Sequence, residues 1–68
     1  MASVTERVAA RVKELRAKRG VSQDTLAEKT GLNRLTITRL EAAAHPPNLE
    51  TLDKIARALG VTVAALVR

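Results

Sequence analysis

The sequence predicts an all-α fold, a compact bundle of five helices that forms a single domain over residues 1–68. Apolar residues recur at helical spacing along most of the chain. Each of the three glycines falls where such a stretch ends, and the next stretch begins near a Ser, Asn or Thr suited to an N-cap. The 18 Val, Leu and Ile residues suffice for one small core, so a second domain is not expected.

The first helix is expected over residues 4–19. Ser3 and Glu6 have the S-x-x-E spacing of a capping box, in which each side chain accepts a hydrogen bond from the backbone amide of the other residue. Gly20 should end the helix in a left-handed conformation. The buried stripe is predicted to consist of Val4, Val8, Val12 and Leu15.

Two short helices joined by a fixed corner are predicted from residues 22–41, SQDTLAEKTGLNRLTITRLE. Ser22 is a suitable N-cap for a helix over residues 23–30, which Gly31 should end. Asn33 then caps a helix over residues 34–42. The side chains expected to pack inward from this pair are Leu26, Ala27, Ile37 and Leu40.

A break and two further helices complete the predicted bundle. Pro46 and Pro47 interrupt the helical pattern, because they lack amide hydrogens and restrict the residues before them. Asn48 restarts a helix over residues 49–59 that ends at Gly60. This helix is predicted to bury Leu49, Leu52, Ile55, Ala56 and Leu59. A last short helix, capped by Thr62, carries Val63, Leu66 and Val67.

Charge and composition favour a duplex nucleic acid as partner. Twelve Lys and Arg against seven Asp and Glu give a net charge of +5, which suits a polyanion, although excess Lys and Arg can also serve solubility alone. Aromatic residues are absent, and single-stranded nucleic acid is commonly held by stacking on aromatic side chains. A nucleic-acid partner is therefore expected to be double-stranded.

The same composition argues against several other classes of protein. The chain has no Cys, no apolar run near the roughly 18 residues of a membrane span, and charged residues where a signal peptide would be apolar. We therefore expect a cytoplasmic protein that does not cross a membrane. No cofactor or metal site is expected, and an enzyme is disfavoured, because one His and solvated carboxylates form no catalytic cluster.

Residues 22–41 resemble the helix-turn-helix of the phage repressor and Cro-type (XRE-type) family of bacterial and phage transcriptional regulators. Gln23 opens the first helix of the motif, Ala27 lies where the two helices cross, and Gly31 makes the turn. The resemblance extends through LRAKRGVSQ before the motif and NLETLDKIARALGVTVAAL after it. It implies a lambda-repressor-like DNA-binding domain, encoded by a bacterium or phage and associated with the nucleoid.

The outward side of the third helix is the predicted reader of DNA. Helical geometry sets Ile37, Leu40 and Glu41 on the inward side. A short helix with Arg at both ends suits the major groove, where Arg can pair bidentately with guanine. The predicted base contacts are Arg34, Leu35, Thr36, Thr38 and Arg39. Plainer interpretations stay open: either Arg can bind phosphate or remain solvated, an exposed Leu needs no partner, and Thr can bond to its own helix.

Contacts to phosphate are expected from helix N-termini and from the loop after the third helix. In the resembled family, the Gln equivalent to Gln23 holds the DNA backbone, and free amides at a helix N-terminus suit the same task. Gln23 could instead only extend the cap of its helix. The predicted phosphate contacts are Ser22, Gln23, Asn33, His45 and Asn48.

Glu41 is predicted to form a structural salt bridge with Arg16, which lies at the edge of the apolar stripe of the first helix. The resembled family often pairs these two positions. Many relatives also place Gly two residues after this Glu, whereas this chain has Ala43. Because Ala avoids left-handed geometry, we expect the third helix to run on by a turn.

The sequence thus predicts a transcriptional regulator, a repressor that binds a near-palindromic operator as a homodimer with half-sites roughly 34 Å apart. The predicted dimer interface is Leu59, Val61, Leu66 and Val67, because the C-terminal segment offers more apolar surface than one small core requires. Alternatively, the last helix only covers the monomer. The main competing hypothesis is an antitoxin or adaptor that binds a partner protein. Membrane-surface binding by the first helix is less favoured, since the core explains its apolar stripe.

Overall fold

The computed structural model describes residues 2–68, which form five helices and, within that range, no strand. The predicted all-α fold is confirmed, and the helix ends lie within one residue of the predicted ranges, apart from the extra turn expected at the end of the third helix. In chain order the helices are α1 (Val4–Lys18), α2 (Gln23–Thr30), α3 (Arg34–Glu41), α4 (Leu49–Leu59) and α5 (Val63–Val67). None of the helices in the described range combines the length and apolarity needed to cross a membrane.

Local capping interactions begin the helices where the sequence predicts. The Ser3 hydroxyl accepts from the Glu6 amide at 3.1 Å, and the Glu6 carboxylate accepts from the Ser3 amide at 3.0 Å, which completes the capping box. Ser22, Asn33, Asn48 and Thr62 are N-caps whose side chains accept from amides in the first turn. Because these contacts span two or three residues, they depend on the local sequence and not on tertiary packing.

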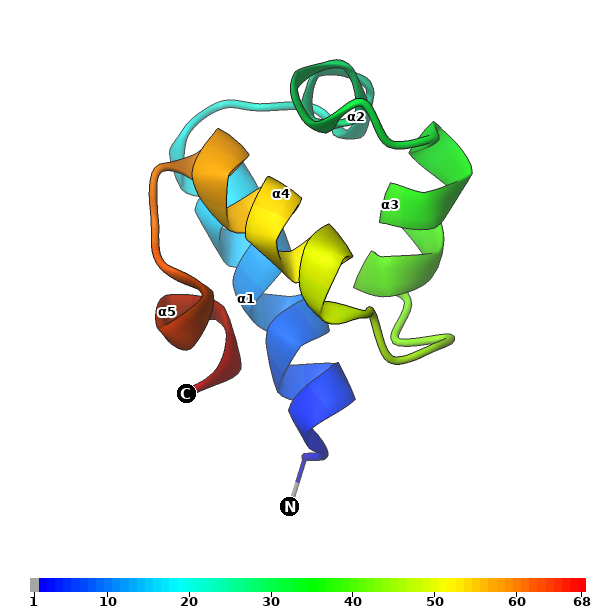
Figure 1. Cartoon of the computed structure of the whole chain (residues 1–68), viewed down its shortest axis with the longest axis vertical. Coiled ribbons are helices and arrows are strands. Elements are labelled where there is room, and N and C mark those ends of the chain that lie inside the picture. Colours follow the sequence, from blue (N-terminus) through cyan, green and yellow to red (C-terminus); the bar gives the residue numbers. More distant parts are fainter. Residues whose placement is uncertain (1) are drawn as a thin grey trace.

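α3 lies at one edge of the molecule (Figure 1). α2 and α1 pack against it, α4 packs against α2 and α5, and α5 returns to α1. The two helices of the motif are joined through Gly31, which has a φ of 72° and ends α2 in a left-handed conformation. This arrangement supports α3 on its inward side and leaves its outward side to solvent.

The core is apolar and well buried for so small a chain. Its members are Val8, Val12, Leu26, Ile37, Leu40, Leu52, Ile55, Ala56, Leu59 and Leu66. Two predicted members are wrong: Val4 is 53% exposed and Leu49 is 77% exposed. Each is the first residue of its helix, and the rest of the chain leaves its side chain largely uncovered. Ala9, which the predicted stripe omits, is buried.

The predicted extension of α3 is also wrong, because the helix ends at Glu41 and Ala43 takes a φ of 55°. The Ala44 amide donates to the Arg39 carbonyl at 3.0 Å, and the Ala43 amide donates to the Leu40 carbonyl at 3.0 Å. This is a Schellman motif with Ala in the left-handed position. Satisfying the last carbonyls and turning the chain toward α4 outweigh the helix propensity of the three alanines.

Candidate nucleic-acid interface

The outward side of α3 is free of contacts from the core. Its exposed side chains are Arg34, Leu35, Thr38 and Arg39, while Thr36 is half-buried. On the inward side, Ile37, Leu40 and Glu41 are buried. Leu35, at 51% exposure, is a large apolar side chain held at the surface. α3 therefore presents a narrow face of two guanidinium groups, hydroxyls and one aliphatic group, at a size that a major groove admits.

Glu41 anchors the inward side of α3 to the rest of the fold. Its Oε2 accepts from Arg16 Nε at 2.7 Å, and its Oε1 accepts from Arg16 Nη2 at 2.9 Å, a bidentate pair. Arg16 Nη1 also donates to the Val21 carbonyl at 3.0 Å. The predicted ion pair is thus present in the structure. It connects α3 to α1 and to the turn that precedes α2.

The surroundings of Glu41 keep its carboxylate ionised. Burial alone would raise the pKa of Glu41, but hydrogen bonds from Arg16 and Gln23, with the charges of Arg16 and Lys13, outweigh burial. The pKa of Glu41 therefore lies below its ordinary value. The ionised carboxylate thus accepts hydrogen bonds from side chains of α1 and α2 at the inward side of α3.

Gln23 belongs to the same network. Its Nε2 donates to Glu41 Oε1 at 3.1 Å, and its Oε1 accepts from Thr38 Oγ1 at 3.1 Å. The amide of Gln23 thereby links the start of α2 to the buried and the exposed side of α3. The second Nε2 hydrogen can still be donated to another acceptor, so contact with a phosphate stays a prediction.

Asp24 was not among the sequence-predicted site residues, yet it contacts one of them. Its Oδ1 lies 3.3 Å from Arg34 Nε, and both side chains are exposed. The pair joins the first turn of α2 to the first residue of α3. Sequence spacing did not indicate it, because the two residues are on different helices and are ten positions apart.

The remaining predicted phosphate contacts include two N-caps, Ser22 and Asn33. The Ser22 hydroxyl accepts from the Thr25 amide and donates to Thr25 Oγ1, both at 3.0 Å, so its one hydrogen is already used within the protein. Asn33 Oδ1 accepts from the Leu35 amide at 2.8 Å. The side-chain NH2 group of Asn33 still offers two donors toward a phosphate.

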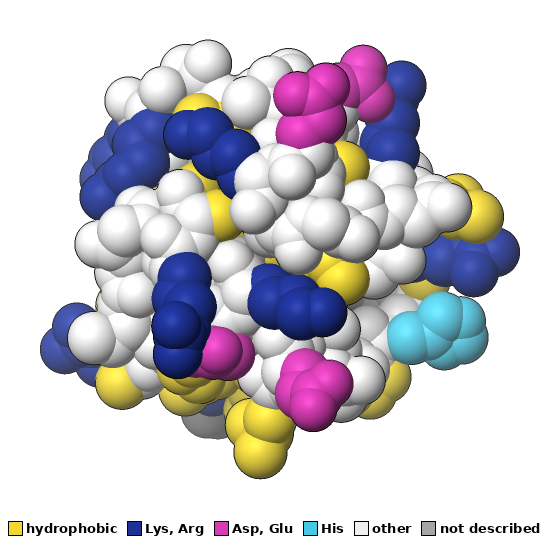
Figure 2. Space-filling view, turned by 45° about the horizontal axis from the view of Figure 1, so that its top comes forward, with side chains coloured by type: hydrophobic (Ala, Val, Ile, Leu, Met, Phe, Trp, Pro, Cys, Tyr) yellow, Lys and Arg dark blue, Asp and Glu magenta, His cyan; other side chains and the backbone are white. Residues whose placement is uncertain are grey.

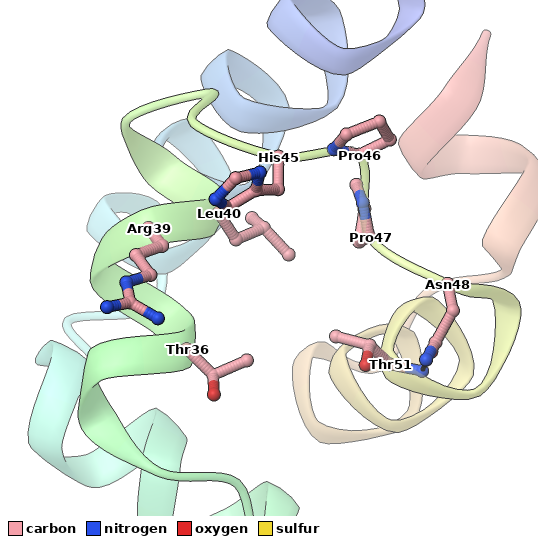
Figure 3. Close-up of a pocket in the computed structure, with 8 residues that line it drawn as sticks. All are labelled: Thr36, Arg39, Leu40, His45, Pro46, Pro47, Asn48 and Thr51. Carbon is pink, nitrogen blue, oxygen red and sulfur yellow. Dashed lines mark hydrogen bonds between the residues drawn. The ribbon is translucent and has the colours of Figure 1, made fainter.

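His45 and Asn48 lie on a groove between α3 and the loop that leads to α4. The groove has a volume of about 230 Å³ and is lined by Thr36, Arg39, Leu40, His45, Pro46, Pro47, Asn48 and Thr51. Figure 3 shows the His45 ring turned toward α3, with Thr36 and Thr51 on opposite sides of the opening. The structure therefore brings predicted base and phosphate contacts to one surface. Sequence reasoning missed Thr51. It also did not anticipate that the two prolines form part of the wall of the groove.

The C-terminal segment differs from the prediction of a surplus apolar surface. Leu59 and Leu66 are 1% and 0% exposed, respectively, because both belong to the core of the single chain. They are therefore not available for an interface. Val61 and Val67 are only half-buried and remain accessible.

Lys and Arg side chains are spread over the face seen in Figure 2, with Asp and Glu between them. The positive charge is thus distributed and forms no single stripe on that face. Within residues 2–68, no group of His, Asp and Glu has the arrangement of a metal site.

A family model described as helix-turn-helix matches residues 12–66, which include α2 and α3. The immunity repressor protein of Bacillus phage phi105 is 40% identical over 60 residues, and the match covers 88% of this chain and 42% of the repressor. This chain therefore spans less than half the length of that relative. An uncharacterized HTH-type transcriptional regulator of Archaeoglobus fulgidus is 41% identical over 56 residues, which cover 82% of this chain and 80% of the regulator.

Solved structures show the same fold. The hypothetical transcription factor NHTF from Neisseria superposes with a TM-score of 0.93 at 29% identity, covering 97% of this chain and 76% of that one. The restriction-modification controller protein C.AhdI from Aeromonas hydrophila gives a TM-score of 0.87 at 32% identity, and the match covers 91% of this chain and 94% of that one.

Proposed function

The chain belongs to the helix-turn-helix family of transcriptional regulators, and on this basis we propose that it is a repressor that binds double-stranded DNA sequence-specifically. The observation that carries the proposal is the outward side of α3, which is exposed while the inward side is held by the Arg16–Glu41 pair. The relative from phage phi105, named an immunity repressor, supports repression as the sign of regulation.

In the proposed complex, α3 enters the major groove and its outward residues face the base edges. Arg39 is the leading reader, because its guanidinium can donate two parallel hydrogen bonds to guanine O6 and N7. Leu35 suits contact with a thymine methyl group. The full set of proposed base contacts is Arg34, Leu35, Thr36, Thr38 and Arg39.

Phosphate contacts would flank this reading helix on two sides. Gln23, Ser22 and Asn33 lie at or just before the starts of α2 and α3, where free amides favour anions. His45 and Asn48 lie on the groove beyond the other end of α3. Such contacts fix the register of a protein on DNA without reading sequence, and the net charge of +5 strengthens them.

We further propose that two copies occupy a near-palindromic operator, with half-sites roughly 34 Å apart. Each half-site would be read by one α3. Contact between the copies would fall on the accessible part of the C-terminal segment, at Val61 and Val67. The protein would act in the nucleoid of a bacterial cell, at the bacterial or phage promoter that contains the operator.

The proposal is tested by selecting bound fragments from a random duplex pool at a stated salt concentration. The selected site is then used to compare Arg39→Ala with Arg57→Ala, which removes the same charge from α4, where Arg57 pairs with Asp53. Arg39→Ala should lose about 1–3 kcal/mol of preference at one base pair. Arg57→Ala should leave the preference unchanged.

A uniform loss across all operator variants would make Arg39 a phosphate contact instead. Gln23→Ala should weaken binding to operator and to random duplex nearly alike, because phosphates carry no sequence information. If no duplex is retained at low salt and a protein co-purifies with the chain, the antitoxin or adaptor function takes the place of the repressor.

A further inference from the structure

The pair between Asp24 and Arg34 is the one ion pair that joins α2 to α3 within residues 2–68. Asp24 Oδ1 lies 3.3 Å from Arg34 Nε, and the side chains are 68% and 63% exposed. Exposed pairs of this kind contribute little to folding stability. Its position matters more, because Arg34 is a proposed base contact and Asp24 brings a negative charge to a surface proposed to meet phosphates.

The geometry leaves Arg34 able to read a base while it is held. A guanidinium has five N–H groups, and Asp24 lies beside the Nε end, with Oδ1 at 3.3 Å from Nε. The two terminal nitrogens keep their four hydrogens, and these form the edge that can donate in parallel to guanine O6 and N7. Asp24 therefore restricts where the guanidinium points without occupying its reading edge.

Without this partner, Arg34 would have an alternative position on DNA. A long, free Arg side chain at the edge of a groove pairs with a phosphate as readily as with a base, and phosphate contacts add affinity for any sequence. The carboxylate of Asp24 disfavours that alternative, because it competes with phosphate for the guanidinium of Arg34.

We propose that Asp24 is a specificity-determining residue, an inference that rests on the proposed binding to operator DNA. Asp24 holds Arg34 in the base-reading position and weakens binding to non-operator duplex. It thereby raises the ratio of the affinity for operator DNA to the affinity for non-operator duplex. The effect should be strongest at the base pair that Arg34 faces.

The test compares Asp24→Asn with Asp53→Asn at a fixed salt concentration. Both changes remove one negative charge from a carboxylate paired with an Arg Nε, at 3.3 Å for Asp24 and 3.0 Å for Asp53. Dissociation constants are measured by fluorescence anisotropy for the selected operator and for a random duplex. Asp24→Asn should tighten random-duplex binding and lower the operator-to-random ratio by about threefold, as expected for the loss of an exposed ion pair. Asp53→Asn should shift both affinities alike.

A double-variant cycle separates positioning from charge. In an Arg34→Ala background, Asp24→Asn should no longer change the operator-to-random ratio, since the side chain it positions is gone. An equal fall in the ratio with or without Arg34 would overturn the positioning role. Equal ratios for Asp24→Asn and Asp53→Asn in the parent background would overturn the proposal while leaving operator binding intact.

Failure of the proposed function itself gives a different result. In that case the unmodified protein would show no preference among duplexes, and both proposals would be overturned together. Thermal unfolding followed by circular dichroism checks that Asp24→Asn and Asp53→Asn remain folded, as expected for exposed side chains.

Discussion

Glu41 is a carboxylate in the interior of a small apolar bundle, and three neighbouring groups determine its state. Arg16 donates two hydrogen bonds to it, Gln23 donates one, and Lys13 contributes positive charge. Burial of a charge is unfavourable unless it is paired and hydrogen-bonded, and here both conditions are met. The orientation of α3 consequently depends on this residue.

Removing Arg16 should lower the free energy of unfolding far more than the loss of an ordinary exposed ion pair does. Arg16→Met leaves Glu41 buried without its main partner, and we expect a loss of about 3 kcal/mol in the free energy of unfolding. Arg57→Met removes an exposed pair within α4 and should cost about 0.3–0.5 kcal/mol. Urea denaturation measures both. Equal losses would mean that the carboxylate of Glu41 finds other partners or water.

The lowered pKa of Glu41 gives the stability a defined dependence on pH. Because the folded-state pKa lies below the unfolded value of about 4.3, this contribution is fully present above that value and is lost as pH falls through the folded pKa. We expect Glu41→Gln to flatten the decline in the urea midpoint below about pH 4.5. Glu6→Gln, at the exposed capping box, is the control and should flatten it less. If the urea midpoint of Glu41→Gln falls with pH as steeply as that of the parent protein, the pH dependence does not come from Glu41.

At the scale of elements, three helix ends use the same hydrogen-bonding pattern with different residues. Gly20 and Gly60 follow α1 and α4 with φ values of 63° and 71°, and Ala43 follows α3 with a φ of 55°. A Cβ in this conformation is unfavourable. The end of α3 therefore stores strain that the other two helix ends avoid.

Ala43→Gly should relieve that strain and stabilise the domain by about 0.5–1 kcal/mol, after the greater backbone freedom of Gly in the unfolded chain is taken into account. Ala44→Gly is the matched control, because Ala44 does not have a positive φ and gains nothing from Gly. Differential scanning calorimetry should show a higher Tm for the first variant only. A lower Tm for both would mean that Ala43 is not strained.

At the scale of the whole molecule, dimensions and core composition limit how two copies meet. The longest principal extent is 31 Å, close to the roughly 34 Å between half-sites one helical turn apart. Leu59 and Leu66 are used by the core of the single chain, which leaves little apolar surface at the C-terminal end. Two copies on one face of DNA would touch over a small area.

We therefore expect a weak homodimer in solution and cooperative binding of two copies on the operator. Sedimentation equilibrium without DNA should show a 7.3 kDa monomer in exchange with a species of twice that mass. Inserting about five base pairs between the half-sites turns them to opposite faces of the duplex and should abolish cooperativity without changing the affinity of either half-site. Equal cooperativity on both operators would rule out contact between the copies.

The positions of the helices could be predicted from the sequence because their ends depend on local interactions. Ser3, Ser22 and Asn33 cap helices through bonds to amides within three residues, and Gly31 ends α2 through its own backbone freedom. The inward and outward sides of α3 follow from helical geometry. The resemblance then added the pairing of Arg16 with Glu41.

Other features depended on where distant segments come to lie. Val4 and Leu49 fit an apolar stripe but are left exposed by the packed helices, and the left-handed Ala43 follows from the path toward α4 against its own propensity. The contacts of Gln23 with Thr38 and of Asp24 with Arg34 also form only when α2 and α3 pack against each other in the folded structure. The sequence by itself therefore determined the five helices, their ends and the exposed side of α3, since these depend on neighbours along the chain. Only the tertiary structure decided which side chains are covered and which polar groups meet, because burial and pairing depend on neighbours in space.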